Sequence, residues 1–233
     1  MAGPHHLPPP GPPDSPALAA RPRQHGVSRR HGLLLLASAL GGPSASPTAQ
    51  AAPPAPPDRA PHFPFGPLPV PRALPRWPVQ THLGQASELA ALCRGRTTAL
   101  QLMFTSCSAT CPLQGALFAQ AQALLAAAPG GPGHLQLLSL SIDPLSDDPV
   151  ALAAWLRRHG AGPFWHAAQP RLADRDAQLA FFNRDALAPP AGSDPHTTQV
   201  HLIDRQGRLV YRTPALPPAE QIAGLLRRID ATP

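Results

Sequence analysis

The sequence contains no lysine, because all 19 of its basic residues are arginines. A Schiff-base enzyme needs a lysine amine and a phosphate-binding P-loop needs a lysine side chain, so both classes are excluded. The net charge of +6 therefore comes from arginine alone. The arginines occur singly or in pairs such as Arg157–Arg158, with no basic run and no interleaved aromatic residues, so we expect no nucleic-acid partner.

Apolar runs are scarce in the first third of the chain, where proline is abundant. Of the 35 prolines, 21 fall within residues 1–78. The rest of the chain, roughly 155 residues, has the length of one ordinary domain and a normal supply of Leu, Ala, Val and Phe. We therefore expect an unstructured, Pro-rich N-terminal segment, with a leader at 1–51, an extended linker at 52–77 and one folded domain at 78–233.

The leader carries the pattern of an export signal. Arg29 and Arg30 precede a short apolar stretch, Gly32–Leu40, in the manner of a twin-arginine signal peptide. This stretch is too short to cross a bilayer, which takes ~20 residues. Ala49–Ala51 has the small-x-small pattern of a signal peptidase site. We expect export to the periplasm, with membrane contact only if the leader stays uncleaved.

Apolar runs of strand length alternate with stretches of helical periodicity in the domain. The predicted strands are Thr98–Thr105, Leu135–Ile142, Val200–Asp204 and Leu209–Arg212, and the predicted helices are Pro112–Ala127, Asp148–His159, Asp174–Phe182 and Pro218–Asp230. Arg205–Gly207 between the last two strands is a hairpin turn signal. This order predicts an α/β fold with a mixed central sheet flanked by helices. A thioredoxin-like fold satisfies the pattern, and a generic doubly wound domain also fits it.

Cys107 and Cys111 fall where the first predicted strand gives way to the first helix. Ligands of open α/β sheets gather at the carboxyl ends of strands, and a helix N-terminus favours the thiolate. Residues i and i+4 share one helix face, so both sulfurs can bind one ion. Thiolates with an imidazole suit Cu(I) and can hold Cu(II), whereas zinc usually takes a fourth ligand. A simple disulfide is the alternative in an oxidising compartment.

Three blocks of the sequence resemble the Sco/SenC family of copper-binding, thioredoxin-fold proteins of cytochrome oxidase assembly. These blocks are Phe104–Pro112 (FTSCSATCP), Ser139–Pro149 (SLSIDPLSDDP) and Pro195–Arg208 (PHTTQVHLIDRQGR). The resemblance covers the chain from about Pro78 to Asp230. It implies a thioredoxin-like fold in which Cys107 and Cys111 are the copper thiolates and His196 is the third ligand of a Cu(I) or Cu(II) ion.

Two positions depart from the family pattern. Family members commonly have Pro-Asp between the cysteines, whereas this chain has Ser108–Thr110. They also commonly have Asp before the histidine, whereas Pro195 precedes His196 here and Asp194 lies one place earlier. The carboxylate that usually adjoins the imidazole is therefore displaced, which bears on how the ligand is oriented and tuned.

The resemblance implies a periplasmic metallochaperone that passes copper to a client enzyme, with the Cu(A) centre of cytochrome oxidase as the family's client. A second hypothesis is a thiol–disulfide oxidoreductase, in which Cys107 and Cys111 are the catalytic pair and a thiol reductant protein is a partner. A structural module with one disulfide and no metal is the third. His196 separates the first two, because copper binding needs it and disulfide exchange does not.

The remaining candidate residues are expected to have structural roles. Cys93 precedes the first strand and is typical of a small buried hydrophobe. Asp143 and Asp147 follow the second strand, at the same edge as the cysteines, so they either order the site's loops or serve as turn and cap residues. We favour the second role, with Asp147 or Asp148 capping the next helix. His201 lies within a strand and is expected to point away from the site.

Overall fold

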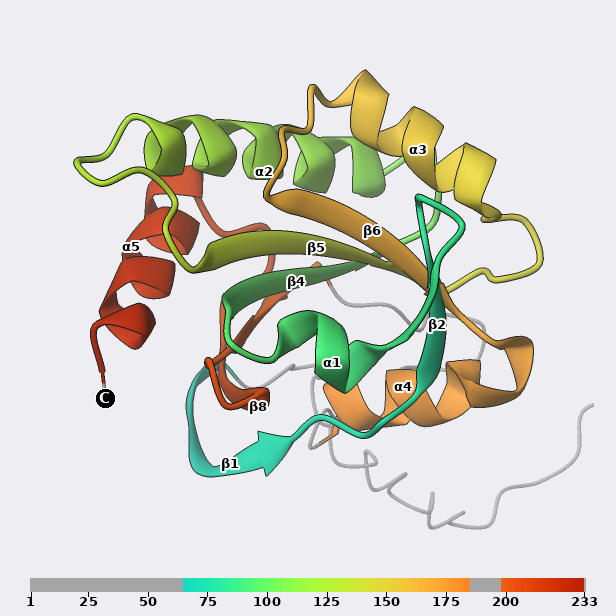
Figure 1. Cartoon of the computed structure of the whole chain (residues 1–233), viewed down its shortest axis with the longest axis horizontal. Helices are drawn as coiled ribbons and strands as arrows, with labels where there is room; N and C mark the ends of the chain where they lie inside the picture. The colour runs from blue at the N-terminus through green and yellow to red at the C-terminus, as the bar shows by residue number, and fades with distance from the viewer. Residues whose placement is uncertain (1–64, 185–197, 233) are drawn as a thin grey trace, which may run out of the picture. The chain divides into compact units, whose positions relative to one another are not determined.

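The computed structural model describes residues 65–184 and 198–232. These residues form an eight-stranded sheet in the order β1-β8-β7-β4-β5-β6-β2-β3, with helices on both faces (Figure 1). The strands are β1 (Gly66–Ala73), β2 (Pro78–Thr81), β3 (Ala86–Glu88), β4 (Thr97–Met103), β5 (Leu135–Ser141), β6 (Trp165–Pro170), β7 (Val200–Ile203) and β8 (Arg208–Arg212). The helices are α1 (Leu89–Cys93), α2 (Cys111–Ala126), α3 (Pro149–Arg158), α4 (Arg175–Phe182) and α5 (Ala219–Asp230), with a 3-10 turn η1 (Leu172–Asp174). Within these two ranges, none of the helices combines the length and the apolar character needed to span a bilayer.

The centre of the sheet is the parallel pair β4 and β5. Thr97 lies opposite Leu135 and Met103 opposite Ser141, and every residue of both strands is buried. A strand covered on both faces has a nearly continuous apolar sequence, which is why both strands are recognisable from the sequence. Because the two strands are parallel and in register, the loops that follow them emerge at the same edge of the sheet.

Helices cover the two faces of the sheet in different combinations. Figure 1 shows α2 and α3 on one side and α1 and α4 on the other, and α5 packs with α2. Successive strand residues point to opposite faces, so Ala99 and Met103 of β4 join the core under α2, α3 and α5. Leu100 and Leu102 join the second core, with Cys93 of α1 and Phe182 of α4. Both faces of the centre are therefore closed to solvent.

The start of α2 is held by close packing at Gly115. The ring of His159, just after α3, lies 2.4 Å from the place that a Cβ at residue 115 would occupy. The same ring packs on Trp155, with ring centroids 4.3 Å apart. Gly115 lies one helical turn beyond Cys111, so this contact fixes the turn that carries the cysteine.

The predicted thioredoxin-like α/β fold with a mixed sheet is confirmed, but the segment expected to be a linker at 52–77 is not linker throughout. Gly66–Ala73 forms β1, which pairs antiparallel with β8 at the edge of the sheet. Its residues Pro67, Pro69 and Pro71 are exposed. An edge strand tolerates proline because one side of its backbone makes no ladder hydrogen bond. The folded part of the chain therefore begins before residue 78.

The predicted strands and helices are present with ends shifted by up to two residues. Sequence patterning missed β2, β3, α1 and β6. The sequence of β6, WHAAQP, has neither an apolar run nor strict alternation, although four of its six residues are buried. Its strand conformation depends on β5 and β2, between which it pairs. Tertiary context therefore outweighs local sequence preference in this strand.

His201 of β7 points away from the cysteines, as its position within a strand predicts, and is fully buried in the core under α1 and α4. Its ring packs against Phe182, with centroids 4.9 Å apart. Burial, and to a smaller degree the charges of Arg212 and Arg72, lower the pKa of His201 to about 3. The native state therefore holds a neutral imidazole at every pH above that value.

Acidification should destabilise the fold through His201. An unfolded histidine titrates at its ordinary pKa of 6.5. Between pH 6.5 and about pH 3, His201 is therefore protonated in the unfolded state and neutral in the native state. From about pH 8 to about pH 5 this difference lowers the free energy of unfolding by about 2 kcal/mol. Urea unfolding of the full chain at both pH values should show the loss in wild type and in His134→Gln, an exposed control. The loss of unfolding free energy should be smaller by about 2 kcal/mol in His201→Gln. An equal loss in all three proteins would contradict the lowered pKa of His201.

Candidate metal centre

Cys107 and Cys111 meet at the N-terminus of α2, directly after the carboxyl end of β4. Cys111 is the first residue of α2 and is fully buried, while Cys107 lies half-buried in the preceding loop. Pro112 occupies the first turn, where its missing N–H leaves no donor unsatisfied. The backbone N–H of Cys111 donates to Sγ of Cys107 at 3.5 Å. The structure thus brings the two predicted thiols to one helix end.

The sulfur of Cys107 acts as the cap of α2. Thr110 stands at the N-cap position, but its side chain makes no capping hydrogen bond. Partial burial raises the pKa of Cys107, but hydrogen bonds from the N–H and thiol of Cys111 and from the N–H groups of Ala109 and Thr110 lower it by more. The pKa of Cys107 is therefore below its ordinary value, which favours the thiolate. A thiolate is the form that both binds metals and attacks disulfides.

Asp147 ties the cysteine loop to the neighbouring strand. Its carboxylate is fully buried in the loop after β5. One oxygen accepts the backbone N–H of Thr105 at 3.0 Å and its hydroxyl at 2.6 Å, and the other accepts the hydroxyl of Ser141 at 2.6 Å. Thr105 lies two residues before Cys107. Asp147 therefore orders the site's loop and is not the cap of α3, which corrects the role we favoured from the sequence.

The neighbouring acidic residues have the turn and cap roles that the sequence predicts. The carboxylate of Asp148 accepts the N–H of Ala151 at 2.7 Å and caps α3. The carbonyl of Asp143 accepts the N–H groups of Ser146 and Asp147 at 3.1 and 3.0 Å, which closes the turn after β5. Sequence reasoning missed Thr105 and Ser141. The only signal for Ser141 is a hydroxyl at the end of an otherwise apolar strand next to the acidic loop.

His196, the predicted third ligand, lies outside the described residues. The described chain resumes at Thr198, whose carbonyl accepts the N–H of Leu216 at 3.1 Å. Val200 pairs with Gln101 in the antiparallel β7–β4 ladder, so the residues before Val200 enter the sheet at the end from which β4 leaves. Residues 65–184 and 198–232 contain no group of three His, Cys, Asp or Glu side chains placed to hold a metal ion. Of the three predicted ligands, the cysteine pair is the part that the described residues include.

Cys93 is excluded from the site by its position. It lies fully buried at the end of α1, in the core on the opposite face of the sheet from α2. Burial raises the pKa of Cys93 to about 12, and a hydrogen bond with Thr98 opposes this only in part. The residue is thus the buried hydrophobe that its sequence context predicts.

Comparison with known proteins gives one family and one fold. The SCO1/SenC family model matches residues 75–230. Among proteins of curated function, none matches this chain by sequence. A SCO1/SenC family lipoprotein from Bacillus anthracis is a similar solved structure, with a TM-score of 0.53 and 23% identity over 70% of this chain and 98% of that chain.

Two further structures show the same fold. BsSco, described as a member of the Sco family of cytochrome c oxidase assembly proteins with a disulfide switch, gives a TM-score of 0.57 and 19% identity over 71% of this chain and 97% of its own. Yeast Sco1 with copper bound gives a TM-score of 0.56 and 17% identity over 70% of this chain and 91% of its own. At these identities the likeness establishes the fold. Because the family model spans more than half of the sequence and includes both cysteines, the chain belongs to the SCO1/SenC family.

Proposed function

We propose that the chain binds one copper ion through Cys107, Cys111 and His196 and passes it to a client enzyme. The observation that carries the proposal is the pair of thiols at one helix N-terminus, with the pKa of Cys107 lowered. Two thiolates and one imidazole form a soft donor set suited to Cu(I) and able to hold Cu(II). Copper is here the cargo, which must both bind and leave.

The chain path supports His196 as the third donor. His196 is two residues before Thr198, and two residues of extended chain span at most about 7 Å. The β7–β4 register supports the proposal, because Val200, the first residue of β7, lies opposite Gln101, near the end of β4 that leads into the cysteine loop. The imidazole would complete a three-donor set contributed by two separate chain segments. Such a site opens when either segment moves, as release of a cargo ion requires.

The surroundings of the cysteines favour contact with a client protein. Leu113, two residues after Cys111, is 56% exposed, and Leu145, in the loop that Asp147 anchors, is 77% exposed. Cys107 itself is half-buried rather than enclosed. Exposed apolar side chains beside a partly open thiol suit a transient docking surface at which a ligand from the client replaces one from the carrier.

The described relatives support a place in oxidase assembly. Yeast Sco1 has been solved with copper bound, and BsSco belongs to a family of cytochrome c oxidase assembly proteins. The Bacillus anthracis relative is a lipoprotein. We propose by analogy that this chain acts in the periplasm, and that its client is the Cu(A) centre of cytochrome c oxidase. The twin-arginine pattern at Arg29–Arg30 supports the location.

A second candidate function is reduction of client disulfides, which the lowered pKa of Cys107 favours. In this reaction the Cys107 thiolate attacks a client disulfide and releases one client thiol, and Cys111 then attacks the Cys107 sulfur of the mixed disulfide and releases the second client thiol. The client gains two electrons and two protons, while a Cys107–Cys111 disulfide forms. A thiol reductant protein would then restore the dithiol. His196 has no part in these steps.

Copper binding should depend on His196. The reduced full chain, loaded with Cu(I) without oxygen and titrated against a chromogenic chelator, should hold one copper per chain. His196→Ala should weaken binding by about tenfold or more, because one of three donors is removed. His134→Ala, which removes an exposed histidine just before β5, is the matched control and should bind as wild type does. Equal affinity in all three proteins, or no copper in wild type, would refute the site and leave disulfide reduction as the leading function.

Asp147→Asn should weaken copper binding while the fold is retained. The substitution replaces one acceptor oxygen by an NH₂ group, so the side chain can no longer accept from both Thr105 and Ser141. The anchor is weakened, because the bond from Ser141 is lost even when the remaining oxygen keeps Thr105, and we expect copper affinity to fall by about tenfold, as for other supports of metal ligands. Asp148→Asn is the control, because it alters only the cap of α3. Wild-type affinity in Asp147→Asn, with an unchanged circular dichroism spectrum, would show that the anchor has no effect on the site.

The three thiols should differ in reactivity in the metal-free protein. Iodoacetamide should modify Cys107 first and continue to do so below the ordinary thiol pKa, because the pKa of Cys107 is lowered. Cys93 should stay unmodified until the protein is unfolded, since burial raises its pKa to about 12. Peptide mass mapping after timed quenching at several pH values measures each rate. Modification of Cys93 at the rate of Cys107 would contradict the assignment.

A further inference from the structure

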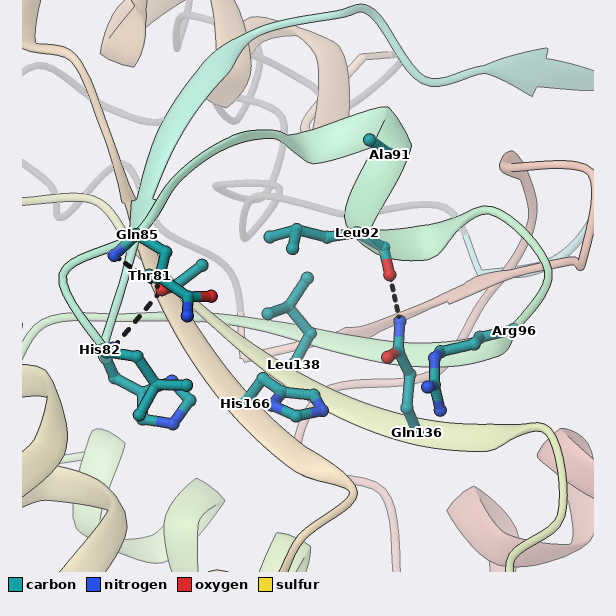
Figure 2. A pocket seen from close by; sticks show the side chains of 10 residues that line it. Thr81, His82, Gln85, Ala91, Leu92, Arg96, Gln136, Leu138 and His166 are labelled. Atoms are coloured by element: carbon teal, nitrogen blue, oxygen red, sulfur yellow. Dashed lines mark hydrogen bonds between the residues drawn. The ribbon is translucent and has the colours of Figure 1, made fainter.

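A second polar site lies on the face of the sheet that α1 covers. It is a pocket of about 300 Å³ between α1, the β2–β3 turn and the first residues of β5 and β6. Its polar lining includes His82, Arg96, Gln136 and His166, and Leu138 contributes apolar surface (Figure 2). The volume lies at the lower end of the range for small-molecule sites. None of these residues takes part in the cysteine site.

The pocket is well separated from the cysteines. Gln136 lies near the amino end of β5, whereas the Asp147 anchor of the cysteine loop binds Ser141 at the carboxyl end. Five residues of strand separate the two positions by about 17 Å. The pocket also lies on the face opposite α2. A ligand in it would not contact the copper donors.

Hydrogen bonds fix the orientation of His82. Nδ1 of the ring lies 3.2 Å from the carbonyl oxygen of Ala167 and 3.3 Å from its N–H, and this carbonyl already accepts the backbone N–H of His82 at 2.9 Å. Ala167 is fully buried, so its N–H needs an acceptor. The tautomer with Nδ1 unprotonated satisfies this N–H and leaves the proton on Nε2. His82 thus has a fixed ring with one N–H donor not used by the strand.

Basic groups surround the half-buried ring of His166. Figure 2 shows this ring between His82 on one side and Gln136 and Arg96 on the other. The two imidazole centroids are 5.8 Å apart. Burial first, and then the charges of His82 and Arg96, lower the pKa of His166. Among the described residues lining the pocket none is acidic, so no carboxylate neutralises this group.

The other walls limit what fits. The amide nitrogen of Gln136 donates hydrogen bonds to the carbonyl of Leu92 at 2.9 Å and to the hydroxyl of Thr98 at 2.7 Å. Gln136 is therefore held rigidly, with its carbonyl oxygen as the remaining polar atom. Leu92 and Leu138 provide apolar surface beside it. The pocket suits a compact ligand with a negative head and a short apolar body.

We propose that this pocket binds a small organic oxyanion, with the guanidinium of Arg96 and the imidazoles of His82 and His166 as its donors. Carboxylates and phosphates share the required chemistry, since each accepts several N–H bonds and carries negative charge. A metal ion held by the two imidazoles is less consistent with the pocket, because Arg96 adds a positive charge and the described lining offers no carboxylate or thiolate. The site is independent of the proposed copper function.

Anion titration of the full chain tests the proposal. Succinate serves as a carboxylate and sulfate as an oxyanion that does not titrate, and the ring protons of His166 are followed by NMR, assigned with His166→Gln. We expect saturable shifts, with succinate binding more tightly than sulfate if the ligand is a carboxylate and the reverse if it is a phosphate-like anion. Arg96→Gln should weaken binding by about tenfold, the loss of one charge-assisted donor.

The control removes the same charge outside the pocket. Arg94→Gln changes an exposed arginine two residues from Arg96 and should bind both anions as wild type does. The charged or titratable groups facing the His166 ring are His82 from the β2–β3 turn and Arg96 from the α1–β4 loop. Saturating sulfate should raise the pKa of His166, because a bound anion offsets their positive charge. No saturable shift, or equal weakening in both variants, would overturn the proposal. A metal site would also overturn it. In that case a chain carrying Cys107→Ser and Cys111→Ser would bind Zn²⁺ through His82 and His166, and anions would leave both rings unperturbed.

Discussion

The buried carboxylate of Asp147 is the contact on which the cysteine loop depends. It joins the loop after β4 to the end of β5 through three hydrogen bonds, one of them to the backbone of Thr105. A charged acceptor with all its bonds made is strongly favourable, whereas the same group with a bond missing leaves a buried charge unsatisfied. The start of the cysteine loop is therefore held at Thr105, two residues before Cys107. Sγ of Cys107 in turn accepts the N–H of Cys111.

This capping contact favours the thiolate of Cys107, the form that the proposed copper site requires. A metal binds the thiolate, so a cysteine at its ordinary pKa must release a proton for each bond formed near neutral pH. The N–H groups of Ala109, Thr110 and Cys111 lower the pKa of Cys107 and remove part of this cost. Cys111 is fully buried and reaches the same site from within the helix. The two sulfurs therefore differ in access, with Cys107 the more accessible of the two.

The sequence was sufficient for the centre of the fold and for the cysteine pair, because both follow local rules. β4 and β5 are apolar on both faces, and a Cys-x-x-x-Cys-Pro run at a strand-to-helix junction predicts two thiols on one helix turn. The exposed prolines of β1 are also typical of extended linkers, so the sequence alone predicts linker there. The sequence favours a cap role for Asp147 because its partner Thr105 is far away in sequence. The pocket between α1 and the sheet cannot be predicted, since the segments that form it carry no shared motif.

The two sites occupy opposite ends of β5, and the physics of that strand makes them independent. β5 is buried along its whole length and hydrogen-bonded on both sides, so a ligand at Gln136 cannot shift it locally without breaking ladder bonds. Charge is the remaining route, and at an effective dielectric constant of about 20 two unit charges about 17 Å apart interact by about 1 kcal/mol, which salt at physiological strength reduces further because the distance is about two Debye lengths. Occupation of the pocket by an anion should therefore change the affinity of the cysteines for copper by less than about fivefold. The fold can carry a cargo site on its loops and a rigid ligand site on its sheet because its central strands separate them.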